Sequence, residues 1–174
     1  EASERALLVP LPAPFEGCAE REVRVSSTAL VHVDRNRYSV DCRYAGKTVS
    51  LRTYADRIVA VAAGVIVGEH VRSFERDRTF FDPWHYVAAL EKKPGALRNG
   101  APFADLPPPL ARLRQALIKR EGGDRVIARV LGAVPVHGLE PVLVAVELVL
   151  ESGALSAEHI ENVLLRLQHP PPLQ

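Results

Sequence analysis

Positively charged residues alternate with small polar residues in the first half of the chain, and this pattern has a clear chemical use. Arg37, Arg43 and Arg52 are expected to project from one surface of a sheet. Cations on a rigid sheet can contact successive phosphates of a nucleic acid, and each contact releases counterions, so binding would weaken steeply with salt. The same alternation also fits an ordinary solvated face, and the pattern alone leaves both interpretations open.

A second cationic segment, KKPGALRNGAPF at residues 92–103, is broken twice by proline and glycine. The prolines restrict the backbone, the glycines permit turns that other residues resist, and Phe103 could anchor the far end. We interpret the segment as a rigid elbow between two units. It could also hold Lys92, Lys93 and Arg98 toward DNA, or its charges could simply be solvated.

Residues that could support catalysis are sparse. The sequence contains no nucleophile elbow, no glycine-rich loop after a strand and no HExxH or CxxC motif. Asp82, His85 and Glu91 lie close together in sequence, but Asp82 is better interpreted as a helix cap and His85 as a hydrogen-bonded neighbour, with Trp84 and Tyr86 packed. We therefore predict no catalytic residue, no metal ligand and no cofactor.

The composition limits the number of domains and shows where the positive charge lies. The chain has 174 residues, 47% of them hydrophobic, and a net charge of +1, which fits one ordinary domain or two small ones. Residues 21–81 hold 11 Lys and Arg against 7 Asp and Glu, whereas residues 101–174 hold 7 against 8. The positive charge therefore belongs to the front half, where it could serve a polyanion.

Targeting signals are not evident. No apolar run approaches the ~20 residues of a membrane span, and the acidic start is unlike a signal peptide. We expect no membrane association, a cytoplasmic location, and reduced thiols at Cys18 and Cys42. Because the chain contains no methionine, we expect it to be part of a longer protein.

The elements that would position the cations fall into four segments. Residues 1–20, with alternating prolines, predict an extended linker. Residues 21–81 show a period of two with regular turn signals, which predicts a small five-stranded SH3-like β-barrel. Residues 82–105 predict a helix and the rigid basic connector, and residues 106–174 an all-α C-terminal domain of about four helices. The predicted fold class is α+β.

Two details of the helical part are specific enough to test. A stripe of Leu110, Leu113, Leu117 and Ile118 predicts the buried face of one helix, and Asp124 is expected to cap the next. The later run VLVAVELVL holds more apolar residues than one stripe needs. Its excess could form a subunit or partner surface.

Four motifs carry a resemblance to a known family. They are NRYSV at 36–40, HVRSFERD at 70–77, DPWHY at 82–86 and EKKPGALRNGAPF at 91–103. In this order they resemble the C-terminal part of IstA-type transposases, an insertion-sequence branch of the integrase-like DDE recombinases. The resemblance extends from about Leu8 to the end of the chain. Asp41 departs from it, because proline is expected there, and adds a negative charge beside Arg37 and Arg43.

The resemblance implies a multidomain parent protein. Such a transposase carries helix-turn-helix modules, an RNase-H-like core with three carboxylates that bind Mg²⁺, a small barrel and a helical C-terminal region. It works with an AAA+ ATPase of the IstB kind. None of the acidic residues here matches the catalytic triad, so no catalytic position is carried over.

These observations lead to one main expectation. The chain would be a non-catalytic C-terminal part of a bacterial DNA transposase, with the barrel on double-stranded DNA of the transposon ends. Its helices would assemble transposase subunits or contact the ATPase. The alternative is a pure protein-interaction module without DNA contact.

Overall fold

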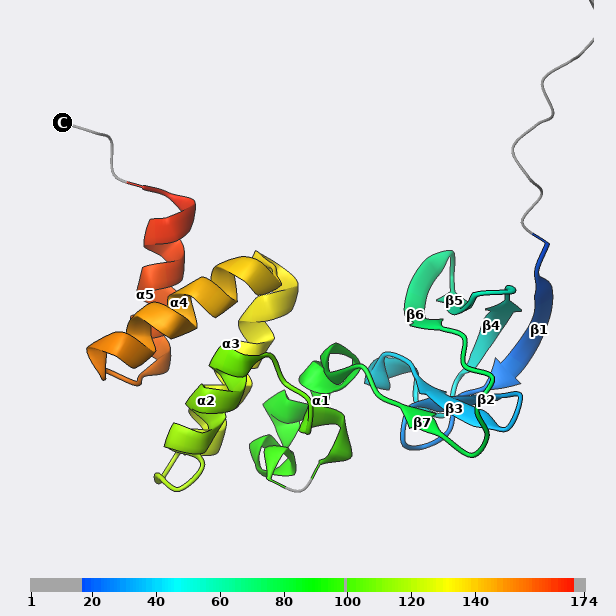
Figure 1. The fold of residues 1–174 in the computed structure, drawn as a ribbon, viewed down its shortest axis with the longest axis horizontal. Coiled ribbons are helices and arrows are strands. Elements are labelled where there is room, and N and C mark those ends of the chain that lie inside the picture. The colour runs from blue at the N-terminus through cyan, green and yellow to red at the C-terminus, as the bar shows by residue number, and fades with distance from the viewer. Residues whose placement is uncertain (1–16, 99, 171–174) are drawn as a thin grey trace, which may run out of the picture.

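The computed structural model describes residues 17–98 and 100–170 and has the predicted α+β class. A β-sheet unit and a helical unit lie at opposite ends of the long axis, with α1 between them (Figure 1). The strands are β1 Ala19–Arg24, β2 Leu30–Val33, β3 Asn36–Ser39, β4 Thr48–Thr53, β5 Arg57–Ala62, β6 Val65–Val71 and β7 Thr79–Phe80. The α-helices are α1 Val87–Lys92, α2 Pro108–Leu117, α3 Gly123–His137, α4 Leu139–Ser152 and α5 Ala157–Gln168.

The strands form two sheets rather than the predicted five-stranded SH3-like barrel. One sheet has four strands in the order β1-β4-β5-β6, and the other has three in the order β2-β3-β7. A hydrogen bond from the Asp41 amide to the Val67 carbonyl, 2.8 Å long, links β6 to the end of β3. In the part of the chain that the structure describes, the strand ladders do not close into a barrel. The alternation in the sequence could not reveal the split, because pairing is decided between distant strands.

Two local features of the β-sheet unit also differ from expectation. Cys42–Tyr44 forms a 3-10 turn rather than a strand, because the Asp41 carboxylate accepts the Arg43 amide at 2.9 Å. β1 begins at Ala19 and pairs with β4 over its whole length. Residues 1–16 of the predicted linker lie outside the described residues.

The core of the β-sheet unit follows the predicted alternation in β4. Val49 and Leu51 are buried, whereas Ser50 and Arg52 lie on the opposite face and are partly exposed. Tyr38 is 1% exposed and stacks on Phe80, with ring centroids 5.2 Å apart. The three-stranded sheet therefore packs against the same apolar core as the four-stranded sheet.

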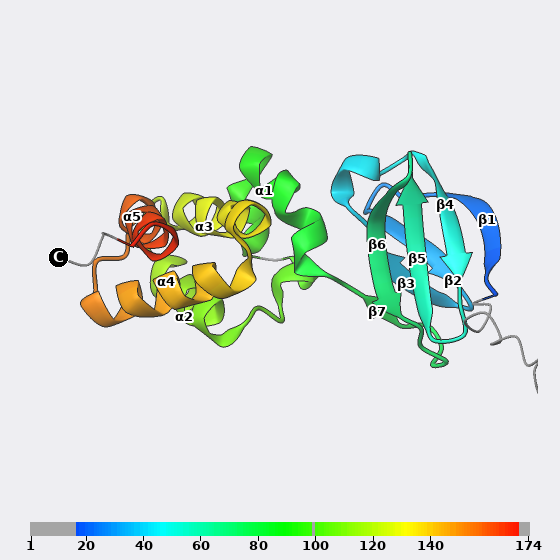
Figure 2. The same cartoon turned by 90° about the horizontal axis from the view of Figure 1, so that it is seen from above.

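The helical unit packs around one apolar cluster, as the leucine stripe predicted. Leu110, Leu113 and Leu117 of α2 are all buried, whereas Ile118, the last residue of the predicted stripe, is only partly buried just past the end of α2. Leu131 of α3 is 0% exposed and belongs to the same cluster. Figure 2 shows α2 to α5 gathered side by side away from the sheets. No helix within residues 17–98 and 100–170 is long and apolar enough to cross a membrane.

The connector is anchored as predicted, although its glycines act differently. Phe103 is 3% exposed and belongs to the helical core. Gly100 has a φ of −86°, which other residues adopt readily. A Cβ there would lie 2.7 Å from the Ala96 carbonyl oxygen, so close packing rather than a left-handed turn requires glycine.

The start of α3 corrects one further prediction. Gly122, with a φ of 74°, is the N-cap residue, and Asp124 lies inside the first turn rather than capping it. The Asp124 carboxylate accepts a 2.7 Å hydrogen bond from Arg98 of the connector. A negative charge in the first turn also suits the helix dipole.

Candidate nucleic-acid interface

Asn36, the first residue of the NRYSV motif, fixes the loop of residues 73–78 against the β2–β3 hairpin. Its side chain is fully buried. Its Nδ2 donates to the carbonyls of Ser73 and Glu75 at 3.1 and 2.8 Å, and its Oδ1 accepts the Arg78 amide at 3.0 Å. Because a buried amide with all these partners is costly to disturb, the loop has one well-defined position.

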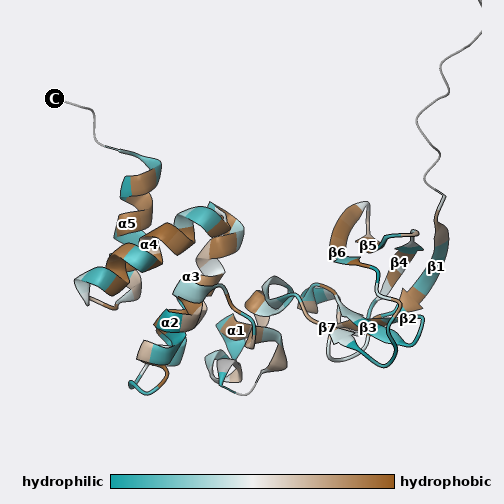
Figure 3. Ribbon diagram, viewed as in Figure 1, coloured by the Kyte–Doolittle hydropathy of each residue, from teal (hydrophilic) through white to brown (hydrophobic). Residues whose placement is uncertain are grey.

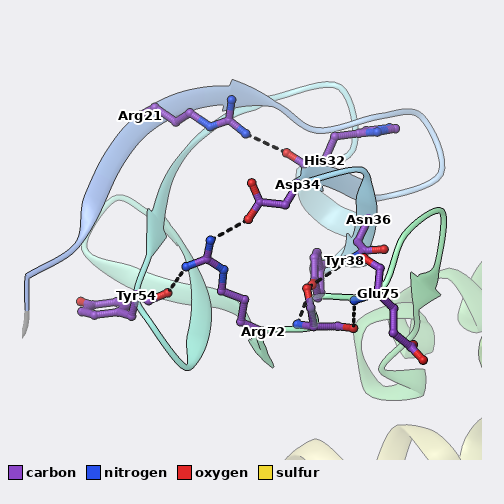
Figure 4. A network of polar contacts seen from close by, with 9 residues as sticks. Arg21, His32, Asp34, Asn36, Tyr38, Tyr54, Arg72 and Glu75 are labelled. Atoms are coloured by element: carbon purple, nitrogen blue, oxygen red, sulfur yellow. Dashed lines mark hydrogen bonds and ion pairs between the residues drawn. The ribbon is translucent and has the colours of Figure 1, made fainter.

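Arg72 joins this loop to both sheets (Figure 4). Its guanidinium donates to the Tyr54 carbonyl at 2.8 Å and to the Asp34 carboxylate at 2.7 Å. The Tyr38 hydroxyl accepts the Ser73 amide at 3.0 Å, immediately after Arg72. The loop therefore lies between the hairpin and the four-stranded sheet as a fixed support.

Ser39, near the end of the same motif, connects the sheets to the segment that leads into α1. Its hydroxyl accepts the Asp82 amide at 2.8 Å and lies 2.8 Å from Nδ1 of His85. Because the Ser39 hydroxyl oxygen accepts the Asp82 amide, the hydroxyl can donate its own proton to Nδ1 of His85. The Asp82 carboxylate accepts the Trp84 amide at 3.0 Å, so both the predicted cap and the predicted neighbour of His85 are confirmed.

Two histidines, His70 and His85, lie next to Ser39. Nε2 of His70 lies 2.6 Å from the Ser39 carbonyl, and the rings of His70 and His85 are 5.5 Å apart. Burial, and next the proximity of His70, lower the pKa of His85, against the opposing charge of Asp82. Ser39 is 0% exposed, so this serine–histidine–aspartate arrangement cannot meet a substrate and acts as a structural joint.

The structure does not bring Arg37, Arg43 and Arg52 onto the single surface that was expected. Arg37 is exposed on β3 of the three-stranded sheet and makes no ion pair with any described residue. Arg43 pairs with Asp41, the residue that departs from the family pattern. Arg52 lies in the other sheet and pairs with Glu20 at 3.2 Å.

The connector cations divide in the same way. Lys92 and Lys93 are exposed, and with Arg43 they line a groove of about 1050 Å³ between the β-sheet unit and α1. Arg98 instead pairs with Asp124, whose side chain is only 16% exposed. Three of the six predicted DNA contacts are therefore brought together in what we call the junction groove, and Arg98 is directed to the helical unit.

Two exposed arginines that were not among the predicted DNA contacts lie on segments beside Arg37. Arg35 and Arg76 are exposed and have no ion pair within the described part of the chain. The Asp77 amide donates to the Arg35 carbonyl at 3.1 Å, and the Arg37 amide to the Arg78 carbonyl at 2.9 Å, so both segments run side by side. Arg35, Arg37 and Arg76 form what we call the hairpin surface.

The sequence held a weak signal for this surface. Asp34-Arg35-Asn36 contains residues typical of turns, and the run ERDR at 75–78 alternates charges. Only the fold shows which charges remain available, because Glu75 pairs with Arg78 at 3.6 Å and Asp34 pairs with Arg72. Within residues 17–98 and 100–170, no group of three His, Cys, Asp or Glu residues is placed to hold a metal ion.

Comparison with known proteins shows which proteins the chain is similar to. Residues 11–82 match the family described as Mu transposase, C-terminal domain. The chain is 48% identical to transposases for insertion sequences IS1326/IS1353 from Pseudomonas aeruginosa and from Shigella flexneri, over 98% of this chain and 35% of each relative. It is 46% identical to a transposase from Aminobacter aminovorans, over 92% of this chain and 32% of the relative. No solved structure matches.

The matched residues 11–82 include all seven strands of the β-sheet unit, so the similarity to a transposase C-terminal domain falls on the sheets. The chain is similar over nearly its whole length to insertion-sequence transposases of the IstA type, as its motifs indicated, and corresponds to a C-terminal part of them. It spans about a third of the length of the curated relatives it matches, 35% of the first two and 32% of the third.

Proposed function

We propose that this chain is the non-catalytic C-terminal part of a DNA transposase and that its β-sheet unit binds double-stranded DNA of the transposon ends. The hairpin surface carries the proposal. Its arginines, Arg35, Arg37 and Arg76, are exposed without a carboxylate partner among the described residues, on a hairpin and loop fixed by Asn36. Unpaired cations on a fixed backbone can contact phosphates without first breaking an ion pair and without ordering the loop.

The other predicted DNA contacts differ in whether the cation already has a carboxylate partner. Arg43, Arg52 and Arg98 would each have to exchange a carboxylate for a phosphate, which lowers the net gain. Lys92 and Lys93 need no such exchange and would extend the contact across the junction groove. The DNA would then touch both the β-sheet unit and the connector.

The reaction itself belongs to the parent protein under this proposal. A transposase of this family would cut and join DNA strands with Mg²⁺ in a separate catalytic core, inside the bacterial cytoplasm. The chain described here would hold the DNA and the assembly in place. Supercoiled plasmid incubated with this chain and Mg²⁺ should therefore remain uncut.

Fluorescence anisotropy of a labelled duplex, titrated at about 50 and about 200 mM salt, tests the DNA role. We expect binding that weakens steeply with salt and that drops when Arg37 is replaced by alanine. Arg52→Ala is the matched control, since Arg52 is already paired with Glu20 and should matter less. A folded chain that binds no duplex at low salt would overturn the proposal.

A second role is supported by the helical unit. α4 is hydrophobic along much of its length (Figure 3), and Val144 and Leu148 on it are 42% and 45% exposed. Such exposed apolar residues suit a contact with another transposase subunit or with the IstB-type AAA+ ATPase. If this contact alone were the function, binding of the partner would persist at high salt and the chain would ignore DNA.

The helical role has its own test. Val144→Ser with Leu148→Ser should reduce self-association, or capture of the ATPase, in light scattering and pull-down measurements. DNA affinity should stay unchanged. A double variant that still assembles and still binds the ATPase as before would remove α4 from the proposal.

A further inference from the structure

Two hairpins of the β-sheet unit have the same turn geometry but different residues in it. The β5–β6 turn lies between the paired residues Ala62 and Val65, with a φ of 50° at Ala63 and 76° at Gly64. The β2–β3 turn lies between Val33 and Asn36. Its two central residues, Asp34 and Arg35, have φ values of 49° and 67°.

Two-residue turns with positive φ at both positions strongly favour glycine at the second, because a Cβ is strained there. Gly64 follows this rule. Asp34 is also an accepted residue at a first position, since a short polar side chain tolerates positive φ. Arg35 stands where glycine would be preferred, so its side chain is retained at a conformational cost.

The turn does not need the Arg35 side chain to keep its shape. The Arg35 carbonyl accepts the Asp77 amide at 3.1 Å, and the Asp34 carboxylate is held by Arg72 at 2.7 Å. Asn36, the next residue, is pinned by its own hydrogen bonds to the loop. Strain that surrounding contacts hold in place is a mark of functional sites.

The surroundings of Arg35 favour a nucleic-acid groove as its target. The guanidinium sits at the tip of a narrow hairpin, is exposed, and has no ion pair with a described residue. Arg72 offsets the charge of Asp34, the adjacent carboxylate. Arg37 follows two residues later on β3, and Arg76 precedes Asp77, whose amide donates to the Arg35 carbonyl. Asp77 is an exposed carboxylate in the same loop. A narrow minor groove concentrates negative potential and attracts single inserted arginines.

We propose that Arg35 enters the minor groove of the bound DNA and senses its width, while Arg37 and Arg76 contact the flanking phosphates. This inference rests on the proposed DNA-binding function. It makes Arg35 a specificity-determining residue that reads DNA shape rather than a base edge. The preferred DNA would have an A-tract, whose minor groove is narrow, where the hairpin tip docks.

Anisotropy with two duplexes of equal length tests this inference, one with a central A-tract and one rich in G·C. The wild-type chain should prefer the A-tract, and netropsin, a minor-groove ligand, should displace it. Arg35→Gly should lower affinity for the A-tract duplex roughly tenfold and abolish the preference. Because glycine suits the turn, the melting temperature should stay equal or rise, so a folding defect cannot explain the loss.

Arg76→Ala is the matched control, because losing a phosphate contact should weaken binding to both duplexes by the same factor. Three outcomes would overturn the inference and leave DNA binding intact: equal wild-type affinity for both duplexes, no competition by netropsin, or unchanged binding by Arg35→Gly. A folded wild-type chain that binds neither duplex would overturn the proposed function as well.

Discussion

The β-sheet unit and the helical unit are held together by different means. The only buried polar side chains in the described part of the chain are Asn36 and Ser39, and both belong to the β-sheet unit. Each fixes a segment more than 30 residues away, 73–78 in one case and 82–85 in the other. The helical unit has an apolar core, with Leu113 and Leu131 fully buried, and no buried polar side chain among its described residues.

Both units contain ion pairs, and the β-sheet unit also has a group of arginines that are unpaired within the described part of the chain. In the helical unit, Arg112 pairs with Glu147, and Arg129 pairs with both Glu158 and Glu161. In the β-sheet unit, the hairpin surface keeps its arginines unpaired among the described residues. A polar network that fixes loops suits a unit that must present charges at defined positions.

Leu131→Ala should have the largest effect on stability if this comparison is right. Leu131 is 0% exposed, so the change should leave a cavity and reduce the free energy of unfolding by about 3 kcal/mol. Urea unfolding monitored by circular dichroism measures this loss. DNA binding by the chain that remains folded should not change. A loss below about 1 kcal/mol would mean that the helical core is poorly packed.

Asn36→Ala should come next, with a loss of about 2 kcal/mol, because two carbonyls and one amide lose their buried partner. The loop should loosen first. Cleavage by trypsin after Arg76 or Arg78 should therefore accelerate, and DNA affinity should fall with it. Asn162→Ala, at an exposed position of α5, is the control and should change neither rate. Equal trypsin resistance in both variants would contradict the role of the network.

His85 should have a smaller, pH-dependent effect on the free energy of unfolding. Burial lowers the pKa of His85 in the folded state below its unfolded value, so the unfolded chain binds more protons. Stability should therefore be full above about pH 6.5 and decline as the pH falls below it, by at most about 1.4 kcal/mol per pH unit for one proton. Unfolding of wild type and His85→Asn, compared from pH 7.5 to about 5, measures this. The variant should show the flatter profile, and parallel profiles would exclude His85 as the source.

Arg98→Ala should have the smallest effect of the four. The Arg98 side chain is 53% exposed, so its pair with Asp124 is partly screened, and a loss of about 0.5 to 1 kcal/mol is expected. Arg112→Ala, which breaks a pair exposed on both sides, should cost less still. Double-mutant cycles with Asp124 and Glu147 separate the two coupling energies. A larger coupling for the Arg112 pair would reverse the ranking of these ion pairs.

Local patterns in the sequence were sufficient for several parts of this fold. The leucine stripe of α2, the alternation of Val49 and Leu51, the anchor at Phe103 and the cap at Asp82 were all confirmed. Each depends on neighbours within one or two turns or on a simple choice between inside and outside. The family assignment was also available from the sequence, because its motifs are short and contiguous.

The sequence by itself determined the fold class, the helical core and the family. Only the tertiary structure decided that the strands form two sheets, and that NRYSV contacts residues of HVRSFERD and DPWHY. It also decided which arginines are paired. Arg52 finds Glu20 across 32 positions, and Arg98 finds Asp124 across 26. Periodicity reports burial one residue at a time, whereas a hydrogen bond or ion pair needs two groups at a defined distance, which the folded backbone alone provides.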